Sequence, residues 1–113
     1  MNKIEAIVRP ERLEAVKAAL ADGGFVGLNV VHVTGRGVQR GIMHSARGGE
    51  AVTVDMLLKV KIETVVREQD TSRAVEIIIK AARTGSIGDG KIFILPVSEV
   101  VRVRTGERGE AAL

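Results

Sequence analysis

Residues 3–20 read KIEAIVRPERLEAVKAAL, and this stretch sets the first half of the fold. Apolar and charged residues alternate over residues 3–9, which predicts a strand. Pro10 suits the first turn of a helix, because its missing N–H would have no partner there. The apolar residues after it have helical spacing, and the pair Gly23-Gly24 is typical of a helix end. The stretch therefore predicts a strand that leads directly into a helix.

The same order of elements returns in the second half of the chain. A second helix is indicated by four apolar residues at i, i+3, i+4 and i+7, namely Ala74, Ile77, Ile78 and Ala81. The other predicted elements are a strand over residues 25–34, a strand that begins near Met56, a strand over residues 91–97 and a short last strand over residues 99–104. Each half of the chain is thus a split βαβ unit.

Two such units predict an α+β fold, a ferredoxin-like βαββαβ sandwich. Its four-stranded antiparallel sheet would carry both helices on one face. We interpret residues 1–113 as a single domain. Several strands carry apolar residues on both faces, so we expect the open face of the sheet to pack against identical subunits.

The composition excludes several classes of site. The 113 residues include 17 Lys or Arg, 14 Asp or Glu, two Phe, and no Cys, Trp or Tyr. Without cysteine there is neither a disulfide nor a thiolate metal site. The net charge of +3 raises a nucleic-acid hypothesis, but basic and acidic residues are mixed along the chain. Two Phe cannot form the base-stacking platform of sheet-based RNA binders. No apolar segment is long enough for a bilayer or a signal peptide, so we expect a cytoplasmic protein.

A glycine-rich segment, residues 35–54, separates the two halves. It follows neither the period of a strand nor that of a helix. Loops of this length inside a compact domain are unusual, and they tend to be functional. We therefore expect partners to be contacted there.

Residues 84–95 read TGSIGDGKIFIL and contain the letters G-x-x-x-x-G-K of a P-loop. A P-loop joins a strand to a following helix and needs Ser or Thr next, whereas here a helix precedes, a strand follows and the next residue is Ile92. The P-loop interpretation therefore fails. Glycine can still let the backbone form an anion-binding nest beside Lys91. The structural alternative is a helix cap at Gly85 and a tight turn at Asp89-Gly90.

Arg102 and Arg104 follow within twenty residues of this stretch. On a strand they would lie on one face, about 6.6 Å apart. Two guanidinium groups side by side suit a polyphosphate. The alternative is an edge strand whose charges discourage aggregation. Together with the glycine nest and Lys91, the pair makes nucleotide binding a competitive hypothesis.

These segments identify a family resemblance. The chain resembles the PII signal-transduction proteins, the nitrogen-regulatory sensors, from Met1 to at least Gly106. The most specific match is T-x-x-x-G-D-G-K-I-F, from Thr84 to Phe93, and VRVRTGE strengthens it. The resemblance implies a homotrimer, with ATP and ADP competing for clefts between subunits. It also implies that 2-oxoglutarate binds with Mg-ATP at the base of the long loop, called the T-loop and taken as residues 37–55.

The resemblance also implies site residues. The nucleotide site would comprise Asn29, Gly35, Gly37, Gln39, Val65, Gly88, Asp89, Gly90, Lys91, Arg102 and Arg104. The effector 2-oxoglutarate would contact Gln39, Gly41 and Lys59, and Gln39 would also bind Mg²⁺. A side-chain carbonyl oxygen suits this hard cation.

Partner binding through the T-loop is implied in the same way. Arg47 stands at a position whose residue, in some relatives, plugs the pore of an ammonium channel. The expected partner is therefore such a channel or an enzyme of nitrogen metabolism. Contact with a membrane would be only indirect, through the channel. Ala51 occupies a position where the family often has a modified Tyr; with no Tyr in the chain, that modification is impossible.

Three departures bear on the nucleotide site. Val38 replaces a basic residue that contacts phosphate, Asn29 replaces a Thr that faces the adenine, and Ser86 replaces a common Lys. They affect the expected affinity more than the expectation of binding itself.

Three alternatives stay open at this point. An enzyme that hydrolyses nucleotides would use Asp89 or Glu63 as its base, although both have structural interpretations. A nucleic-acid module would show salt-dependent binding to oligonucleotides. Within the family, a nitrogenase-associated relative is compatible with the loop that lacks Tyr.

Overall fold

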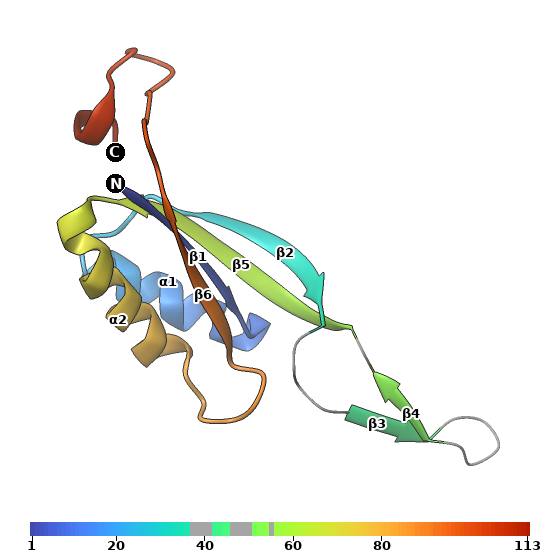
Figure 1. Cartoon of the computed structure of the whole chain (residues 1–113). Coiled ribbons are helices and arrows are strands. Elements are labelled where there is room, and N and C mark those ends of the chain that lie inside the picture. The colour runs from blue at the N-terminus through green and yellow to red at the C-terminus, as the bar shows by residue number, and fades with distance from the viewer. Residues whose placement is uncertain (37–41, 46–50, 55) are drawn as a thin grey trace.

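The computed structural model describes residues 1–36, 42–45, 51–54 and 56–113 (Figure 1). Its elements in chain order are β1 (Asn2–Val8), η1 (Pro10–Arg12), α1 (Leu13–Asp22), β2 (Asn29–Gly35), β3 (Ile42–Ser45), β4 (Ala51–Val54), β5 (Leu57–Val66), η2 (Glu68–Asp70), α2 (Thr71–Ala82), β6 (Gly90–Pro96) and η3 (Gly109–Ala112). The three η elements are short 3-10 helices, and η1 begins at Pro10, the residue predicted to lie in the first turn of a helix.

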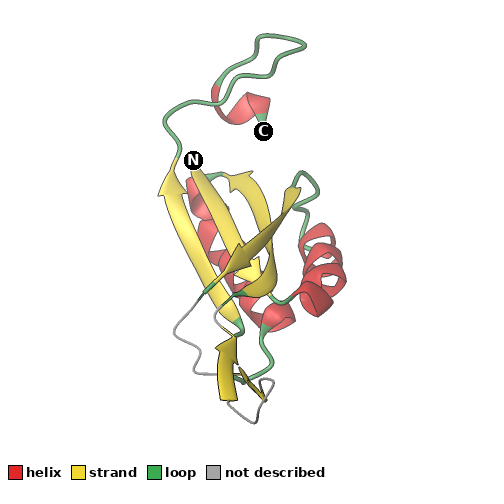
Figure 2. Ribbon diagram, turned by 90° about the vertical axis from the view of Figure 1, so that its right-hand side faces the viewer, coloured by secondary structure: helices red, strands yellow, loops and turns green. Residues whose placement is uncertain are grey.

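One antiparallel sheet of four strands organises the chain, in the order β2-β5-β1-β6. Both α-helices cover the same face of this sheet (Figures 1 and 2). The predicted ferredoxin-like α+β fold is therefore confirmed. At the end of the central strand β1, Val8 pairs with Val60 on one side and with Gly90 on the other. This register brings the first residues of β6 beside the last residues of β1.

The core lies between the sheet and the two helices. Alternate residues of β1 and β5 point into it, as the period-2 pattern predicts. The largest fully buried side chains are Ile4, Leu20, Ile62, Ile78, Val16 and Val60. In the part of the chain that the structure describes, no helix is both long and apolar enough to cross a membrane.

The open face of the sheet is charged at its centre. Glu5 and Glu63 stand opposite each other on β1 and β5. Lys3 Nζ lies 3.1 Å from Glu5 Oε1 and 3.5 Å from Glu63 Oε2, and Lys61 Nζ lies 3.2 Å from Glu63 Oε1. The hydrogen bond from Lys61 and the nearby Lys3 hold the pKa of Glu63 below its ordinary value. These lysines offset the repulsion between the two carboxylates.

One exposed apolar strip of the open face runs along the edge strand β6. Phe93 stands opposite Glu5 on β1, so its side chain lies on this face, and it is 46% exposed. Leu95, two residues further along the same face, is 40% exposed. Packing of this face against identical subunits stays a prediction.

The start of β2 and the content of the glycine-rich segment differ from the sequence prediction. The strand expected over residues 25–34 begins only at Asn29, because the chain is still turning out of α1. Phe25 N–H donates to Leu20 O over 2.8 Å, and Gly24 has a φ of +88°. The glycine-rich segment also contains regular structure, since β3 and β4 form a two-stranded antiparallel sheet inside it. Main-chain pairing needs no alternating side-chain pattern, so the sequence period gave no signal for it.

The prediction of a short strand over residues 99–104 is wrong. Val101 makes a single isolated bridge with Arg108. Between them the chain turns back, and Gly106 N–H donates to Arg102 O over 2.8 Å. Gly106 has a φ of +72°, which glycine adopts without strain. Arg102 and Arg104 therefore lie on a turn and not on one face of a strand.

Candidate functional site

A cavity of about 310 Å³ opens between β6, β5 and the end of β2. The structure brings five predicted site residues together around it, namely Gly35, Lys59, Gly88, Gly90 and Lys91. They come from three separate strands and from the loop after α2. Ile7, Leu57, Ile87 and Phe93 supply an apolar part of its wall.

The charge of this cavity is of one sign. Arg36, Lys59 and Lys91 line it, and no carboxylate is among the described residues of its wall. Desolvation by burial and the neighbouring Arg9 lower the pKa of Lys59 below its ordinary value. A bound anion would relieve both effects, because it favours the charged ammonium group. The cavity is therefore suited to a small anionic ligand.

Lys59 also holds the loop that follows α2. Its Nζ donates a hydrogen bond to the main-chain oxygen of Gly88. The predicted contact of Lys59 with 2-oxoglutarate would thus lie directly beside the predicted phosphate loop. The structure couples the two predicted ligand regions through one ammonium group.

The loop between α2 and β6 closes around the Asp89 carboxylate. The main-chain N–H groups of Thr84 and Gly85 each donate to Asp89 Oδ2 over 2.9 Å. Thr84 Oγ1 bonds to Asp89 Oδ1, and Arg9 Nε donates to the same oxygen over 3.0 Å. The bond from Thr84, followed by those from Arg9 and the main chain, holds the pKa of Asp89 far below its ordinary value. The carboxylate thus stays ionised and fixes the loop.

This arrangement changes the predicted glycine nest. The carboxylate of Asp89 already occupies the N–H groups at the start of the loop, and Ser86 N–H donates to Thr84 Oγ1. The N–H groups of Ile87 and Gly88, the two central residues of the next turn, make no hydrogen bond with the described residues. Gly88 has a φ of +100°. The free N–H groups that could bind a phosphate are therefore those of Ile87 and Gly88.

Arg9 is a site residue that the sequence reasoning missed. Besides its bond to Asp89, its Nη2 donates to Ile87 O over 2.8 Å. It directly follows β1, and Asp89 directly precedes β6, the antiparallel partner of β1. An Arg and an Asp just outside two paired strand ends were the available signal, but it could be used only once the pairing was known.

Gly90 is required by close packing as well as by its conformation. Its φ is +108°, and a Cβ built on it would lie 1.8 Å from Ile7 O. No side chain fits there without displacing β1 or β6. Gly85 was predicted to end the helix, but α2 ends at Ala82 and Arg83 is already extended. Gly85 instead lies inside the loop with a φ of +90° and nothing within 4 Å of a built Cβ.

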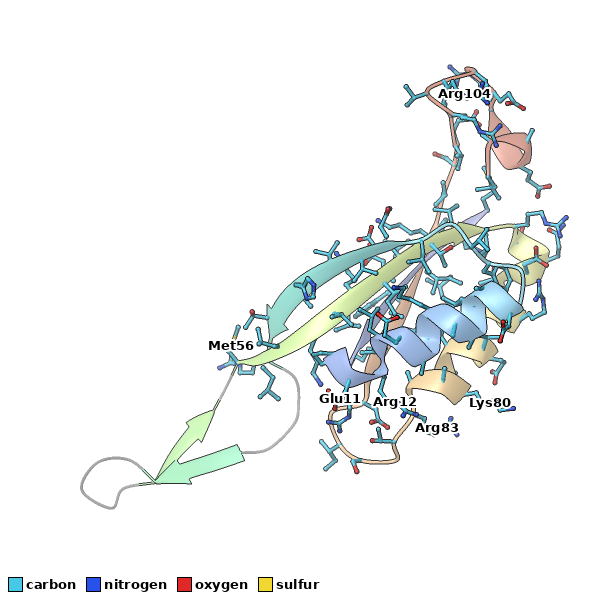
Figure 3. The ribbon with its side chains drawn as sticks, turned by 180° about the vertical axis from the view of Figure 1, so that it is seen from behind. Glu11, Arg12, Met56, Lys80, Arg83 and Arg104 are labelled. Atoms are coloured by element: carbon cyan, nitrogen blue, oxygen red, sulfur yellow. The ribbon has the colours of Figure 1, made fainter. Side chains whose placement is uncertain are left out.

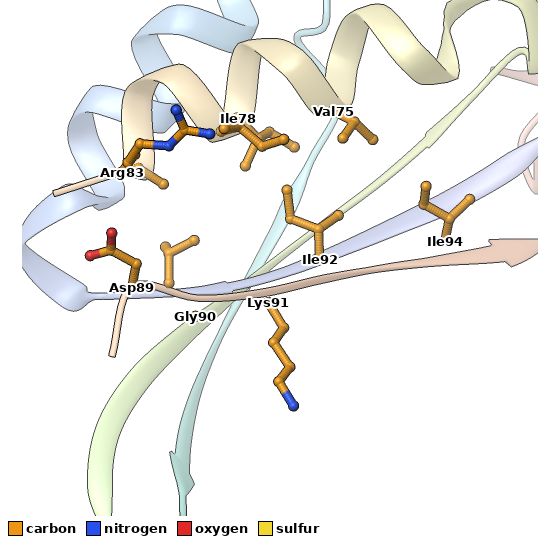
Figure 4. A pocket seen from close by; sticks show the side chains of 11 residues that line it. Val75, Ile78, Arg83, Asp89, Gly90, Lys91, Ile92 and Ile94 are labelled. Carbon is orange, nitrogen blue, oxygen red and sulfur yellow. The ribbon is translucent and has the colours of Figure 1, made fainter. Parts of the chain in front are cut away.

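A second cavity, of about 390 Å³, lies on the helix side of β6 (Figure 4). Its walls are mostly apolar side chains of α2 and β6, such as Val75, Ile92 and Ile94. Figure 4 shows Lys91 pointing to the opposite side of β6 from Ile92 and Ile94. The Lys91 ammonium group therefore serves the first cavity.

The remaining described site residues lie toward the other end of the sheet. Asn29 on β2 pairs with Glu63 on β5, and Val65 lies two residues further along β5. Figure 3 shows Arg104 on the C-terminal segment, far from Met56, which precedes the cavity end of β5. The seven-residue strand β6 alone spans about 20 Å between these ends. One chain therefore does not bring Arg102 and Arg104 to Lys91.

Four predicted residues lie outside the described part of the chain: Gly37, Gln39, Gly41 and Arg47. Their proposed roles in nucleotide, Mg²⁺, 2-oxoglutarate and partner binding stay predictions. Among the residues that are described, no group of three or more His, Asp or Glu could hold a metal ion.

The geometry also bears on the two candidate general bases. The pKa of Asp89 and that of Glu63 are both held below their ordinary values, by Thr84 and Lys61 respectively. A carboxylate with a lowered pKa is a weak proton acceptor near neutral pH. The lowered pKa values therefore count against both residues as general bases.

The chain is similar to known proteins over its whole length. The family model "Nitrogen regulatory protein P-II" matches residues 1–107. "Nitrogen regulatory protein P-II 2" of Methanothermobacter thermautotrophicus is 54% identical over 113 residues, which is all of this chain and 97% of that protein. "Nitrogen regulatory protein P-II" of Microchaete diplosiphon is 51% identical over the whole of both chains.

A solved structure is also similar. It is described as Arabidopsis thaliana PII bound to citrate, with a TM-score of 0.79 and 46% identity. The match covers 99% of this chain and 91% of that one. The likeness therefore extends over the sheet, both helices and the loop that follows α2.

The fit around Gly90 leads to the first prediction. Gly90→Ala should lower the free energy of unfolding by about 3 kcal/mol or more, because the new Cβ collides with Ile7 O and the positive φ is strained. Gly85→Ala is the matched control, with the same kind of φ but open space, and should cost about 1–2 kcal/mol. Urea unfolding measures both, and equal losses would contradict the role of the Ile7 contact.

The Asp89 contacts lead to a pH prediction. Its folded pKa lies below the ordinary value of 3.8, so its contribution to stability is complete above that value and is lost as the pH falls below it. The stability of the wild type should therefore fall more steeply below about pH 4 than that of Asp89→Asn. Asp22→Asn, an exposed carboxylate with no ion pair in the described structure, should follow the wild type. Parallel urea titrations for the wild type and Asp89→Asn would disprove the assignment.

Proposed function

Because the chain belongs to the nitrogen regulatory protein P-II family, we propose that it is a cytoplasmic signal-transduction regulator controlled by nucleotides. ATP and ADP compete for its site, and 2-oxoglutarate binds together with Mg-ATP. The T-loop presents the result to partner proteins.

The cationic cavity is the observation that carries this proposal. It joins Lys59, Lys91 and Arg36 to the free N–H groups of Ile87 and Gly88, with no carboxylate in its described wall. Phosphate needs both positive charge and several main-chain donors. Apolar residues such as Ile7 and Phe93 supply the less polar contact that a nucleotide also needs.

The separation of the site residues supports a site shared between subunits. Lys91 and Gly88 lie at one end of the sheet, and Arg102 and Arg104 lie beyond the other end. Both sets can reach one nucleotide only if they come from different copies of the chain. The exposed apolar strip of β6, with Phe93 and Leu95, is available to pack in such an assembly. We propose the homotrimer that the family resemblance implies.

A carboxylate effector fits the same region. The solved relative is described as bound to citrate, a tricarboxylate. Lys59 has a lowered pKa and lies beside the phosphate loop, so a carboxylate there would stabilise its charged form. Gln39, from the T-loop, would hold the Mg²⁺ that links the effector to ATP.

Partner control is proposed for the T-loop. A channel for ammonium, contacted through Arg47, or an enzyme of nitrogen metabolism is the expected partner. A nitrogenase-associated role within the family is the alternative. Neighbouring genes would separate the two, since an ammonium-channel gene favours the first and nitrogenase genes favour the second.

A regulator is favoured over a hydrolase. The relatives are named as regulatory proteins, and the pKa of each candidate base, Asp89 and Glu63, is lowered by its partners. Steady ATP turnover that is lost in Asp89→Ala would reverse this choice. Salt-dependent binding to an oligonucleotide would instead favour the nucleic-acid alternative.

Calorimetry with ATP tests the nucleotide site. The wild type should bind ATP and ADP, and Lys91→Met should weaken binding by about tenfold or more, because a charge-assisted contact with phosphate is lost. Lys80→Met, an exposed lysine on α2, is the matched control and should bind as the wild type does. If neither nucleotide binds to the wild type at millimolar concentration, the proposal fails.

Calorimetry with 2-oxoglutarate tests the effector site. Binding should require Mg-ATP, and Lys59→Met should abolish it while ATP still binds. Lys61→Met, two residues along the same strand and paired with Glu63, should leave it intact. Binding to nucleotide-free protein, or normal binding by Lys59→Met, would contradict the proposed effector site.

A further inference from the structure

The guanidinium group of Arg102 is already bound within its own segment. Its Nη1 lies 2.7 Å from Glu107 Oε1. Its Nη2 donates to the main-chain oxygens of Ala111, over 3.2 Å, and Leu113, over 3.3 Å. Arg102 therefore lies in a small site of its own, in which the anion is a carboxylate of the same chain.

The turn around this pair holds the carboxylate in place. Thr105 Oγ1 donates to Glu107 Oε1 over 2.9 Å, so two donors converge on one oxygen. The main chain closes the same turn, because Arg102 N–H donates to Glu107 O over 2.9 Å and Gly106 N–H donates to Arg102 O over 2.8 Å. The Glu107 carboxylate is thus held against Arg102 by the backbone and by a hydroxyl.

Arg104 on the same turn is different. Its side chain is exposed, and in the described part of the chain it makes no hydrogen bond or ion pair. Of the two arginines proposed for the nucleotide site, one is therefore ready for an anion and the other is occupied.

We propose that Glu107 is a built-in competitor for the ligand anion at Arg102. An incoming phosphate takes the place of its carboxylate, and Arg102 leaves Glu107 and the oxygens of Ala111 and Leu113. No bond other than hydrogen bonds and ion pairs changes. The inference rests on the proposed nucleotide function and adds to it a residue that limits affinity.

The exposure of the pair sets the size of the effect. The Arg102 side chain is 37% exposed and that of Glu107 is 45% exposed. Ion pairs this open to water are weak. Removal of the competing charge should therefore tighten nucleotide binding by about two- to fivefold.

The experiment is a double-mutant cycle on the whole protein with ATP as the probe. Glu107→Gln keeps the shape of the side chain and removes its charge, and it should bind ATP about two to five times more tightly than the wild type. Glu110→Gln removes the same charge from the same segment, where its carboxylate has no partner among the described residues, and should change little. In an Arg102→Ala background, Glu107→Gln should give no gain.

Every other result contradicts the proposal that Glu107 competes for Arg102. Unchanged or weaker binding by Glu107→Gln overturns it, and so does an equal gain in Glu110→Gln, which would be a general effect of charge. A gain that persists without Arg102 overturns it too, because Glu107 would then repel the ligand directly. The amide resonance of Gly109, whose N–H donates to Val100 O, verifies that the turn is intact in each variant. Failure of the wild type to bind ATP is a separate result, which removes the proposed function and this inference together.

Discussion

The Asp89 carboxylate joins the loop after α2 to the end of β1, and the shape of the candidate site depends on that junction. It accepts hydrogen bonds from the main-chain N–H groups of Thr84 and Gly85 and from the guanidinium group of Arg9. With those donors occupied, the N–H groups left over are the ones near Gly88. One close approach of the backbone, Gly90 against Ile7, fixes the distance between the strands at the same place. The loop is thus held from both sides before any ligand arrives.

Charge then divides the molecule into two parts with different tasks. At one end, Lys59, Lys91 and Arg36 face a common cavity without a carboxylate in its described wall. At the other end, Arg102 is neutralised by Glu107 within a single turn. In our proposal, the first region binds an anion directly, and in the second an anion must displace Glu107 from Arg102. Both behaviours follow from where the acidic partners stand, and not from the number of basic residues.

Much of this could be predicted from the sequence, for identifiable reasons. The strand–Pro–helix pattern at residues 3–20 and the helical face around Ile78 report local periodicity, so the fold class followed. The glycines of the loop after α2 were correctly taken as conformational sites, because Gly85, Gly88 and Gly90 all have positive φ. The family resemblance supplied the site residues that the comparisons leave untested.

The errors share one cause, which is that partners distant in sequence decided the outcome. The bond between Asp89 and Arg9, eighty positions away, was missed for this reason, and the place of Asp89 in the nucleotide site stays a prediction. Residues 99–104 alternate like a strand, but none of the described strands pairs with them and the chain turns back at Gly106. The hairpin of β3 and β4 depends on main-chain pairing, which leaves no trace in the composition of the loop.

The distance between Lys91 and Arg104 has a consequence for the number of complete sites in an assembly. If a complete site combines the Lys91 end of one copy with the Arg104 end of another, every chain contributes its two ends to two different sites. A closed ring of such chains has as many complete sites as members, whereas an open pair has one complete site and two unfinished ones. A chain defective at one end and a chain defective at the other could then restore one whole site between them in a mixed ring. Ring closure would be part of the chemistry of the site, in the same sense as the charge of Lys91.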